Sequence, residues 1–189
     1  MMIGVPLGLF AGFYGGWVDA TINVLLQIVR SIPIFFLLLV LSVLFRPTPL
    51  GLAVMLGVLG WTNTARQVRA IAFSVKNREY VDAARALGAQ DYRIILRHIL
   101  PNLSSIILVI AGFDIASAIL TEAGLSFLGF GVQPPIPSWG NMLSDSLENA
   151  RSAPWLIVSP GVFITTTVLC IFLFSDGLRD AFDTVTGKQ

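Results

Sequence analysis

The sequence predicts an all-α protein, a polytopic bundle of about five transmembrane helices with the first one incomplete. Of the residues, 55% are hydrophobic, and the mean hydropathy is +0.80. Only 12% are charged, whereas a soluble domain has about 25% charged residues. The net charge of +1 argues against nucleic-acid binding, and a single cysteine, Cys170, excludes a disulfide within the chain. These properties indicate an integral membrane protein.

The first apolar segment, Ile3–Phe13, has about half of the roughly 20 residues that a helix needs to cross a bilayer. It lacks the basic region and the cleavage site of a signal peptide. We therefore expect the end of a transmembrane helix whose beginning is missing, in a chain shortened at its N-terminus. Gly4, Gly8 and Gly12 fall on one helix face, where small residues allow close helix packing.

Four longer apolar segments follow and are expected to span the membrane. They are Ile22–Phe45, interrupted by Arg30 and Pro33, then Leu50–Val68, Asn102–Thr121 and Trp155–Phe174. Between them we expect short turns at Tyr14–Thr21 and Arg46–Pro49, and after Phe174 a polar tail. Arg30 is close enough to a helix end to extend its charge to the membrane surface.

The basic residues predict the orientation of these spans. Nine of them fall on the side of the loop 71–101, namely Arg66, Arg69, Lys76, Arg78, Arg85, Arg93, Arg97, Arg179 and Lys188. Only Arg46 and Arg151 fall on the opposite side. The positive-inside rule then places the loop 71–101 and the C-terminus in the cytoplasm, and the loop 123–154 outside. In that outer loop, GLSFLGFG suggests a short re-entrant or interfacial piece, and residues 139–149 a short amphipathic helix at the membrane surface.

The longest polar interruption, Glu79–Asn102, has a helical pattern. Tyr80, Ala83, Ala84 and Leu87 share one helix face, and Gly88 follows them where a left-handed cap commonly ends a helix. A second helix is expected from Asp91, with Tyr92, Ile95, Leu96 and Ile99 at the same spacing, before Pro101 stops it or opens the next segment. Two short amphipathic helices joined at a glycine predict a docking element.

This segment resembles the EAA loop of ABC-transporter permease subunits. The matching residues are Asp82-Ala83-Ala84, Gly88 and Leu100-Pro101. The sequences EYVDAARALGA, RHILPN and GLSFLGFGVQPPIPSWGNML are similar to those of the dipeptide/oligopeptide/nickel branch of importers. The resemblance covers essentially the whole chain. Asp82 stands where the general motif has Glu, and His98 where it has an isoleucine. Both departures leave the length from Gly88 to Pro101 unchanged.

The resemblance implies one permease domain, residues 1–189, in a bacterial or archaeal plasma (inner) membrane. Its expected partners are a second homologous permease, two cytoplasmic ATPase subunits and an extracytoplasmic substrate-binding protein. The residues expected to dock into the ATPase are Glu79, Tyr80, Asp82, Ala83, Ala84, Leu87, Gly88, Arg93 and Pro101. The implied cargo is a short peptide, with nickel as the alternative.

The chain is not expected to be an enzyme. It contains no Walker-type phosphate loop and no visible nucleophile–base pair, and one histidine cannot build a histidine-rich metal site. ATP and Mg²⁺ would therefore be bound by the partner ATPase subunits, and this chain is expected to bind no cofactor or metal.

Asp114 and Glu122 lie within or near the end of an apolar span, where a charged side chain is costly. They either line or gate a translocation pathway, or they satisfy polar groups between helices. A second hypothesis makes them the ion sites of a secondary transporter, but no inverted repeat is evident and the docking loop is then unexplained. A third hypothesis is a membrane-embedded assembly protein.

Overall fold

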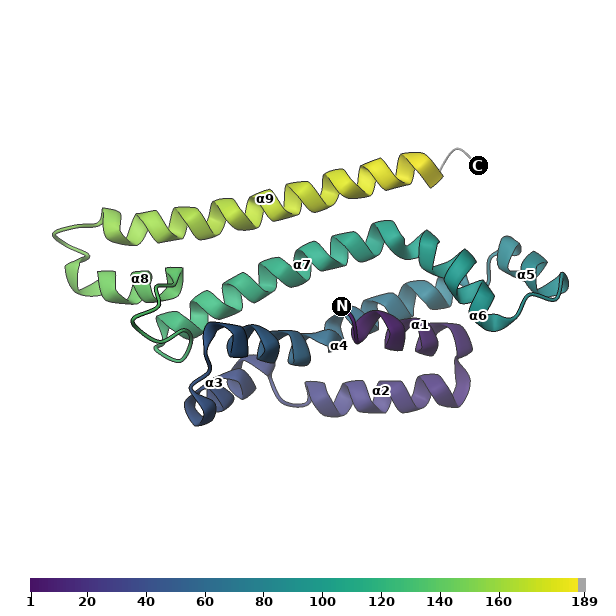
Figure 1. Ribbon diagram of the computed structural model, residues 1–189, viewed down its shortest axis with the longest axis horizontal. Coiled ribbons are helices and arrows are strands. Elements are labelled where there is room, and N and C mark those ends of the chain that lie inside the picture. Colours follow the sequence, from purple (N-terminus) through teal and green to yellow (C-terminus); the bar gives the residue numbers. More distant parts are fainter. Residues whose placement is uncertain (187–189) are drawn as a thin grey trace. The chain divides into compact units, whose positions relative to one another are not determined.

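Every secondary-structure element in the described residues is a helix, which confirms the predicted all-α class (Figure 1). The computed structural model describes the backbone of residues 1–186 and the side chains of residues 1–182, so the predicted cytoplasmic Lys188 lies outside the described residues. The helices are α1 (Gly4–Tyr14), α2 (Gly16–Arg30), α3 (Ile34–Phe45), α4 (Pro49–Val75), α5 (Glu79–Ala86), α6 (Asp91–Ile94), α7 (Leu100–Phe127), α8 (Trp139–Ser146) and α9 (Trp155–Thr186). A π-helical turn, Ile95–Ile99, joins α6 to α7, and a 3₁₀ turn, Leu147–Asn149, follows α8.

Two continuous helices among the described residues are long and apolar enough to cross a membrane. One runs from Asp91 to Phe127 over 37 residues, and the other runs from Trp155 to Phe182 over 28 residues. The pair α2 and α3 passes the same test together. The helix α1 has only 11 residues, and the second half of α4 is polar. Each of the five predicted spans is thus helical. Two of them meet the length and composition of a membrane span, and a third does so if α2 and α3 are taken together as one span.

The predicted span Ile22–Phe45 is not one straight helix. Its halves, α2 and α3, are bent by 62° at the break between Arg30 and Ile34. Pro33 explains the break, because proline has no N–H to donate and also disfavours the helical conformation of the residue before it. The predicted turn Tyr14–Thr21 is also wrong for most of its length. Only Gly15 and Gly16, with positive φ of 67° and 51°, form the corner, and α2 begins at once.

The predicted polar tail after Phe174 is helical as well, since α9 continues without a break to Thr186. The short turn predicted at Arg46–Pro49 is confirmed: α3 ends at Phe45, and Pro49 opens α4. Proline is favourable at the first position of a helix because the N–H missing there has no partner within the helix. The predicted outer amphipathic helix is found as α8 with its 3₁₀ turn.

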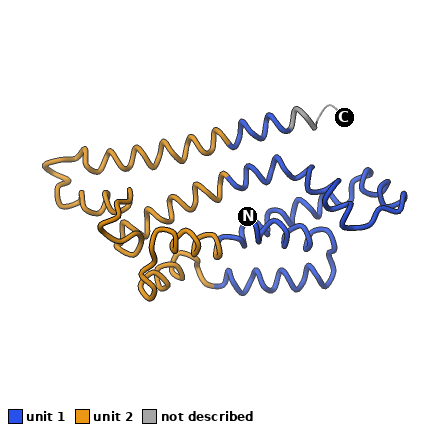
Figure 2. The backbone as a smooth tube through the Cα atoms, viewed as in Figure 1, with its two compact units in different colours: residues 1–31, 60–111, 175–189 blue, residues 32–59, 112–174 orange. Residues whose placement is uncertain are grey.

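The chain forms two compact units (Figure 2). Unit 1 contains residues 1–31, residues 60–111 and the part of α9 from Ser175, and unit 2 contains residues 32–59 and 112–174. The core of unit 1 is a cluster from α1, α4, α5 and the helix beginning at Asp91, with Leu9, Phe13, Val68, Val81, Ile94 and Leu103 among its members. The smaller core of unit 2 consists of Leu38, Leu52, Leu125 and Val132.

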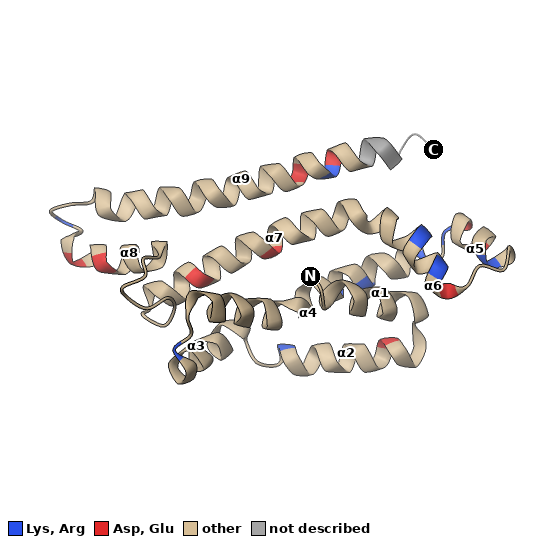
Figure 3. Ribbon diagram, viewed as in Figure 1, with Lys and Arg blue, Asp and Glu red and all other residues tan. Residues whose placement is uncertain are grey.

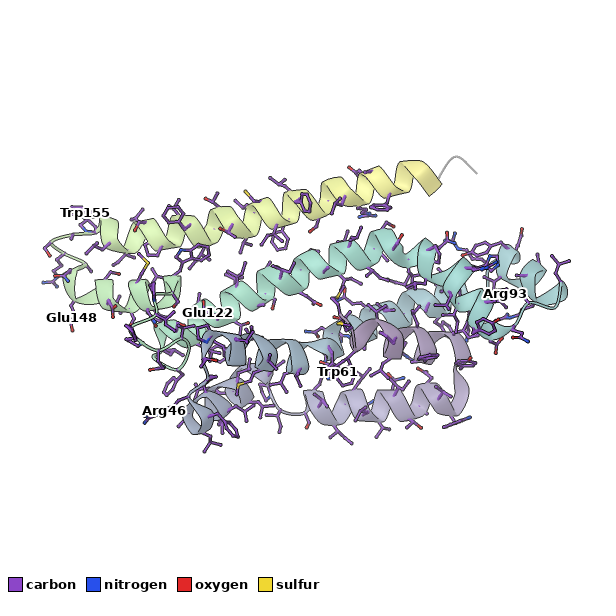
Figure 4. The ribbon with its side chains drawn as sticks, viewed as in Figure 1. Arg46, Trp61, Arg93, Glu122, Glu148 and Trp155 are labelled. Atoms are coloured by element: carbon purple, nitrogen blue, oxygen red, sulfur yellow. The ribbon has the colours of Figure 1, made fainter. Side chains whose placement is uncertain are left out.

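In unit 1, α1 packs against α4 with backbone touching backbone. A Cβ atom placed on Gly4, Gly8 or Gly12 would lie 2.5–2.6 Å from a main-chain oxygen of α4, those of Trp61, Ala65 and Arg69 respectively. No side chain fits at such a distance, so the sequence expectation of close packing by this glycine row is confirmed. Figure 4 labels Trp61 beneath α1.

We expect Gly8→Ala to destabilise the protein by about 1–3 kcal/mol, because the added methyl group would force α1 and α4 apart. The matched control is Gly57→Ala, at a helical glycine with open space around it. This control should be neutral or stabilising by up to about 1 kcal/mol, since alanine is the better helix former. Thermal unfolding in detergent, followed by tryptophan fluorescence, measures both. Equal effects would contradict the close contact.

Candidate functional site

The loop 71–101 is built around a sharp reversal at Gly88. Gly88 has φ of +80°, and its N–H donates to the Arg85 carbonyl at 2.9 Å, while the Ala89 N–H donates to the Ala84 carbonyl at 3.0 Å. This pair of bonds is the Schellman motif, in which a left-handed residue ends a helix and satisfies its last carbonyls. The predicted left-handed glycine is therefore confirmed, and α5 has a defined end.

The residues predicted to share one face of α5 are divided between core and surface. Ala84 is buried and Tyr80 half-buried against the core of unit 1, together with Val81. Ala83 is exposed, and Leu87 is 88% exposed at the point where the chain turns. The burial that fixes α5 raises the pKa of the Tyr80 hydroxyl. The helix thus has a buried side, which holds it, and a free side.

The second helix also begins at Asp91 as predicted, but its buried face differs from the prediction. Ile94, Ile95 and Ile99 are buried, whereas Tyr92 and Leu96 are 57% and 58% exposed. The cause is the π turn Ile95–Ile99, in which the Leu100 N–H donates to the Ile95 carbonyl, five residues back. A π turn advances each residue by a smaller angle than an α-helix does, so Ile99 returns to the side of Ile94.

Pro101 lies two residues after the π turn. A proline in an α-helix leaves one carbonyl without its donor and clashes with the preceding turn. Here the helix passes through Pro101 without a break, and the Asn102 side chain donates to the His98 carbonyl at 2.6 Å. Pro101 opens α7, the second of the two expected alternatives, within one continuous helix.

Most of the predicted docking residues lie on the surface. Glu79, Asp82, Ala83, Leu87, Gly88, Arg93 and Pro101 are exposed. Figure 3 shows the charged residues of α5 and α6, and Figure 4 labels Arg93. Asp82 pairs with Arg85 at 3.2 Å, an exposed contact worth under about 1 kcal/mol. Their docking role stays a prediction.

Three large apolar side chains of the polar segment 79–102 are exposed, namely Leu87, Tyr92 and Leu96. We call them the loop anchors. The sequence prediction included Leu87 but no role for Tyr92 or Leu96 beyond the helix pattern. The exposure of Tyr92 and Leu96 could not be read from periodicity, because the π turn decides which side of their helix faces the core.

In unit 2, Glu122 is tied to the segment that follows α7. Its Oε1 accepts a hydrogen bond from the Ser126 hydroxyl at 2.6 Å, and the Ser126 oxygen accepts one from the Val132 N–H at 3.0 Å. Ser126 is buried, and Gly131 and Gly140 pack so closely around it that neither could carry a side chain. Glu122 (labelled in Figure 4) is thus linked through Ser126 to the segment after α7, and its predicted role in a pathway stays a prediction.

The segment GLSFLGFG, predicted as a re-entrant or interfacial piece, begins inside α7. Gly124–Phe127 complete α7, and Gly129, with φ of +81°, ends the helix in a second Schellman motif. In that motif the Phe130 N–H donates to the Leu125 carbonyl at 2.8 Å, and the Gly129 N–H donates to the Ser126 carbonyl at 2.9 Å.

A row of residues on another side of α7 lines an open cavity of about 360 Å³. Phe113, Ala116, Ser117, Leu120 and Thr121 form its wall on α7, with Phe35 of α3 and Phe172 of α9. Asp114 is half-buried beside this row, whereas Glu122 is held by Ser126. The structure thus does not bring the two predicted pathway residues to one site. Among the described residues, no group of three or more His, Cys, Asp or Glu side chains is placed to hold a metal ion.

Two polar contacts in unit 1 are not indicated by the sequence pattern. Asp19 of α2 and Arg69 of α4 form an ion pair. Near the end of α1, the Phe13 carbonyl accepts a hydrogen bond from Lys76 at 3.3 Å. The partners of the ion pair are 50 residues apart, so no local pattern indicates it.

Comparison with known proteins places this geometry in context. The family described as "Binding-protein-dependent transport system inner membrane component" matches residues 4–186. The chain is 36% identical over 183 residues to the oligopeptide transport system permease protein of Mycobacterium tuberculosis, covering 96% of this chain and 63% of that protein. It is 39% identical over 169 residues to the protein of the same name in Escherichia coli, covering 89% of this chain and 56% of the relative.

The dipeptide transport system permease protein of Lactococcus lactis is 36% identical, with 97% of this chain and 53% of the relative covered. The chain thus spans between about half and two thirds of the length of these curated relatives. Among solved structures, a chain from inward-facing conformations of the MetNI methionine ABC transporter matches with a TM-score of 0.73 and 19% identity. The match covers 96% of this chain and 86% of the other, and it supports the fold.

The reversal at Gly88 gives a local prediction. Gly88→Val should weaken the Schellman motif by about 1–2 kcal/mol, because a branched side chain disfavours positive φ. Gly88→Asn, the matched control, should cost less, since asparagine adopts the left-handed conformation more readily. The measurement is hydrogen exchange of the Ala89 amide, which should become about tenfold faster in Gly88→Val. The same exchange rate in both variants would contradict a left-handed residue 88.

Proposed function

Because the chain belongs to the family of binding-protein-dependent transport system inner membrane components, we propose that it is a permease subunit of an ATP-driven importer of short peptides. Relatives that match nearly the whole chain are named as oligopeptide and dipeptide permeases, which supports this cargo class. The membrane-spanning α7 and α9 would form part of one half of the translocation pathway.

The observation that carries the proposal is the construction of the loop 71–101. Val81 and Ala84 of α5 and Ile94 and Ile99 of the following helix are buried in the core of unit 1, so the loop is anchored to the membrane helices. The loop anchors Leu87, Tyr92 and Leu96 face away from that core. Exposed apolar side chains on a firmly held segment are suited to insert into a groove of another protein. A loose linker would have neither feature.

The proposed complex contains a second homologous permease, two cytoplasmic ATPase subunits and an extracytoplasmic binding protein. ATP and Mg²⁺ are bound by the ATPase subunits, which displace α5 and so bias the spans between inward-open and outward-open states. The loop 71–101 and the C-terminus are then cytoplasmic, and α8 faces the outside. This chain supplies the pathway and the mechanical link and performs no hydrolysis.

Within the pathway, Asp114 is proposed to contribute a polar group beside the apolar row on α7. Glu122 has a different proposed role, because it accepts a hydrogen bond from Ser126, whose oxygen in turn accepts from the Val132 N–H in the segment after α7. Cargo selection by the binding protein agrees with the apolar lining of the cavity, where Ser117 and Thr121 are the polar members.

The test is uptake of a labelled dipeptide, and separately of labelled nickel, in cells that lack the gene encoding this chain. Restoring the gene should restore peptide uptake. Restoring it with Leu87→Asp should reduce uptake about tenfold or more, because a charge would replace an apolar anchor at the ATPase contact. The matched control is Leu147→Asp, at an exposed leucine beside α8, which should leave uptake unchanged.

Nickel uptake with the same response to Leu87→Asp would replace the peptide by the metal as cargo. Uptake that is restored but does not respond to Leu87→Asp or to Gly88→Asp would remove the docking role of the loop. Uptake that persists without ATP and follows an ion gradient would instead favour a secondary transporter.

A further inference from the structure

The ion pair between Asp19 and Arg69 joins α2 to α4, and α2 has little apolar packing of its own. Arg69 donates to both carboxylate oxygens of Asp19, through Nε to Oδ1 and through Nη2 to Oδ2 at 2.6 Å. Asp19 also accepts a hydrogen bond from the Asn23 side chain at 2.9 Å. The side chains of Asp19 and Arg69 are only 21% and 31% exposed, so water competes weakly for their charged groups. Two parallel bonds from one guanidinium fix direction as well as distance.

The helix α2 depends on this pair because its apolar packing is sparse. In the described structure Leu26 is its one buried residue, while Trp17, Val24 and Ile28 are 80%, 56% and 64% exposed. Asp19 lies in the first turn of α2, where a negative charge is also favoured by the helix dipole. The end of α2 next to α1 is thus held mainly by a polar contact.

Arg69 is itself fixed by α1. Its main-chain oxygen is the atom that a side chain on Gly12 would strike at 2.6 Å. One residue of α4 therefore contacts α1 through its backbone and α2 through its side chain. A movement of α4 at Arg69 must therefore move both α1 and α2, which form a helical hairpin joined at Gly15 and Gly16.

The same hairpin is attached to the docking loop at Phe13, near the end of α1. The Phe13 ring is buried in the cluster that contains Val81 and Ala84 of α5, and the Arg85 guanidinium lies 5.5 Å from its centre. Its carbonyl accepts from Lys76, which directly follows α4. A continuous series of contacts thus runs from α5 through Phe13 to the corner at Gly15, and the ion pair extends it to α2.

We propose that Asp19 and Arg69 are positioning residues that make α2 follow the docking loop, so that ATP-driven displacement of α5 moves α2 and not α1 alone. This inference rests on the proposed function. Loss of the pair should uncouple the two activities: ATP would still be hydrolysed, but less cargo would be moved for each ATP.

The experiment uses the assembled transporter, with both permeases, both ATPase subunits and the binding protein, in proteoliposomes. Import of a labelled dipeptide and hydrolysis of ATP are measured in the same vesicles, and their ratio is compared between variants. In Asp19→Asn the ratio should fall about fivefold or more, within the range of allosteric coupling, with hydrolysis little changed. Asp19→Glu keeps the carboxylate and should retain most of the ratio.

Arg69→Lys is a milder second variant, because lysine keeps the charge but cannot form two parallel bonds. Its ratio should lie between those of the parent and Asp19→Asn. The matched control is Asp145→Asn, an aspartate on the exposed surface of α8, which should behave like the parent. Co-purification of all subunits measures assembly for each variant.

An unchanged ratio in Asp19→Asn would overturn the proposal. So would loss of assembly in Asp19→Asn, because the pair would then hold the complex together without transmitting motion. A parent complex that shows no ATP-dependent peptide import would instead contradict the proposed function. The two failures are therefore distinguishable.

Discussion

The architecture of unit 1 depends on the close approach of α1 to α4. Backbone contact at Gly4, Gly8 and Gly12 leaves no room for side chains between these helices, and in a lipid environment such packing replaces the hydrophobic force that holds soluble helices together. The contact also fixes the position of Phe13, against which α5 packs. It fixes the backbone of Arg69 as well, whose side chain forms the ion pair with α2. Three glycines thereby determine where the docking loop is held.

The docking loop combines a held side with a free side. Val81, Ala84 and Ile94 are buried in the core, while Leu87, Tyr92 and Leu96 remain exposed. The Schellman motif at Gly88 reverses the chain, and the π turn before Pro101 shifts the buried face of the helix, both without loss of backbone hydrogen bonds. A loop with these properties is suited to the proposed transmission of force, because a displacement of its free side would be passed on to the residues buried in the core.

In unit 2, the carboxylate of Glu122 is stabilised by a hydrogen bond within its own helix. Glu122 is costly near the end of an apolar helix, and the Ser126 hydroxyl meets that cost by donating a hydrogen bond to it. The same serine accepts from Val132, and at the start of α8 the Trp139 ring stacks on Phe163 of α9 with centroids 6.5 Å apart. A polar network of this kind fixes the segment after α7 in one arrangement.

The sequence by itself determined the helical class, the close-packing row of α1, the left-handed position at Gly88 and the start of the helix at Asp91, because each follows from residue type and local spacing. The tertiary structure alone decided which apolar residues of the loop are buried, since a π turn shifts the helical period by an amount that the sequence pattern does not contain. It also decided that Asp19 meets Arg69, 50 residues further along the chain. Such pairings depend on how helices distant in the chain approach one another, and hydrophobic periodicity describes only one helix at a time.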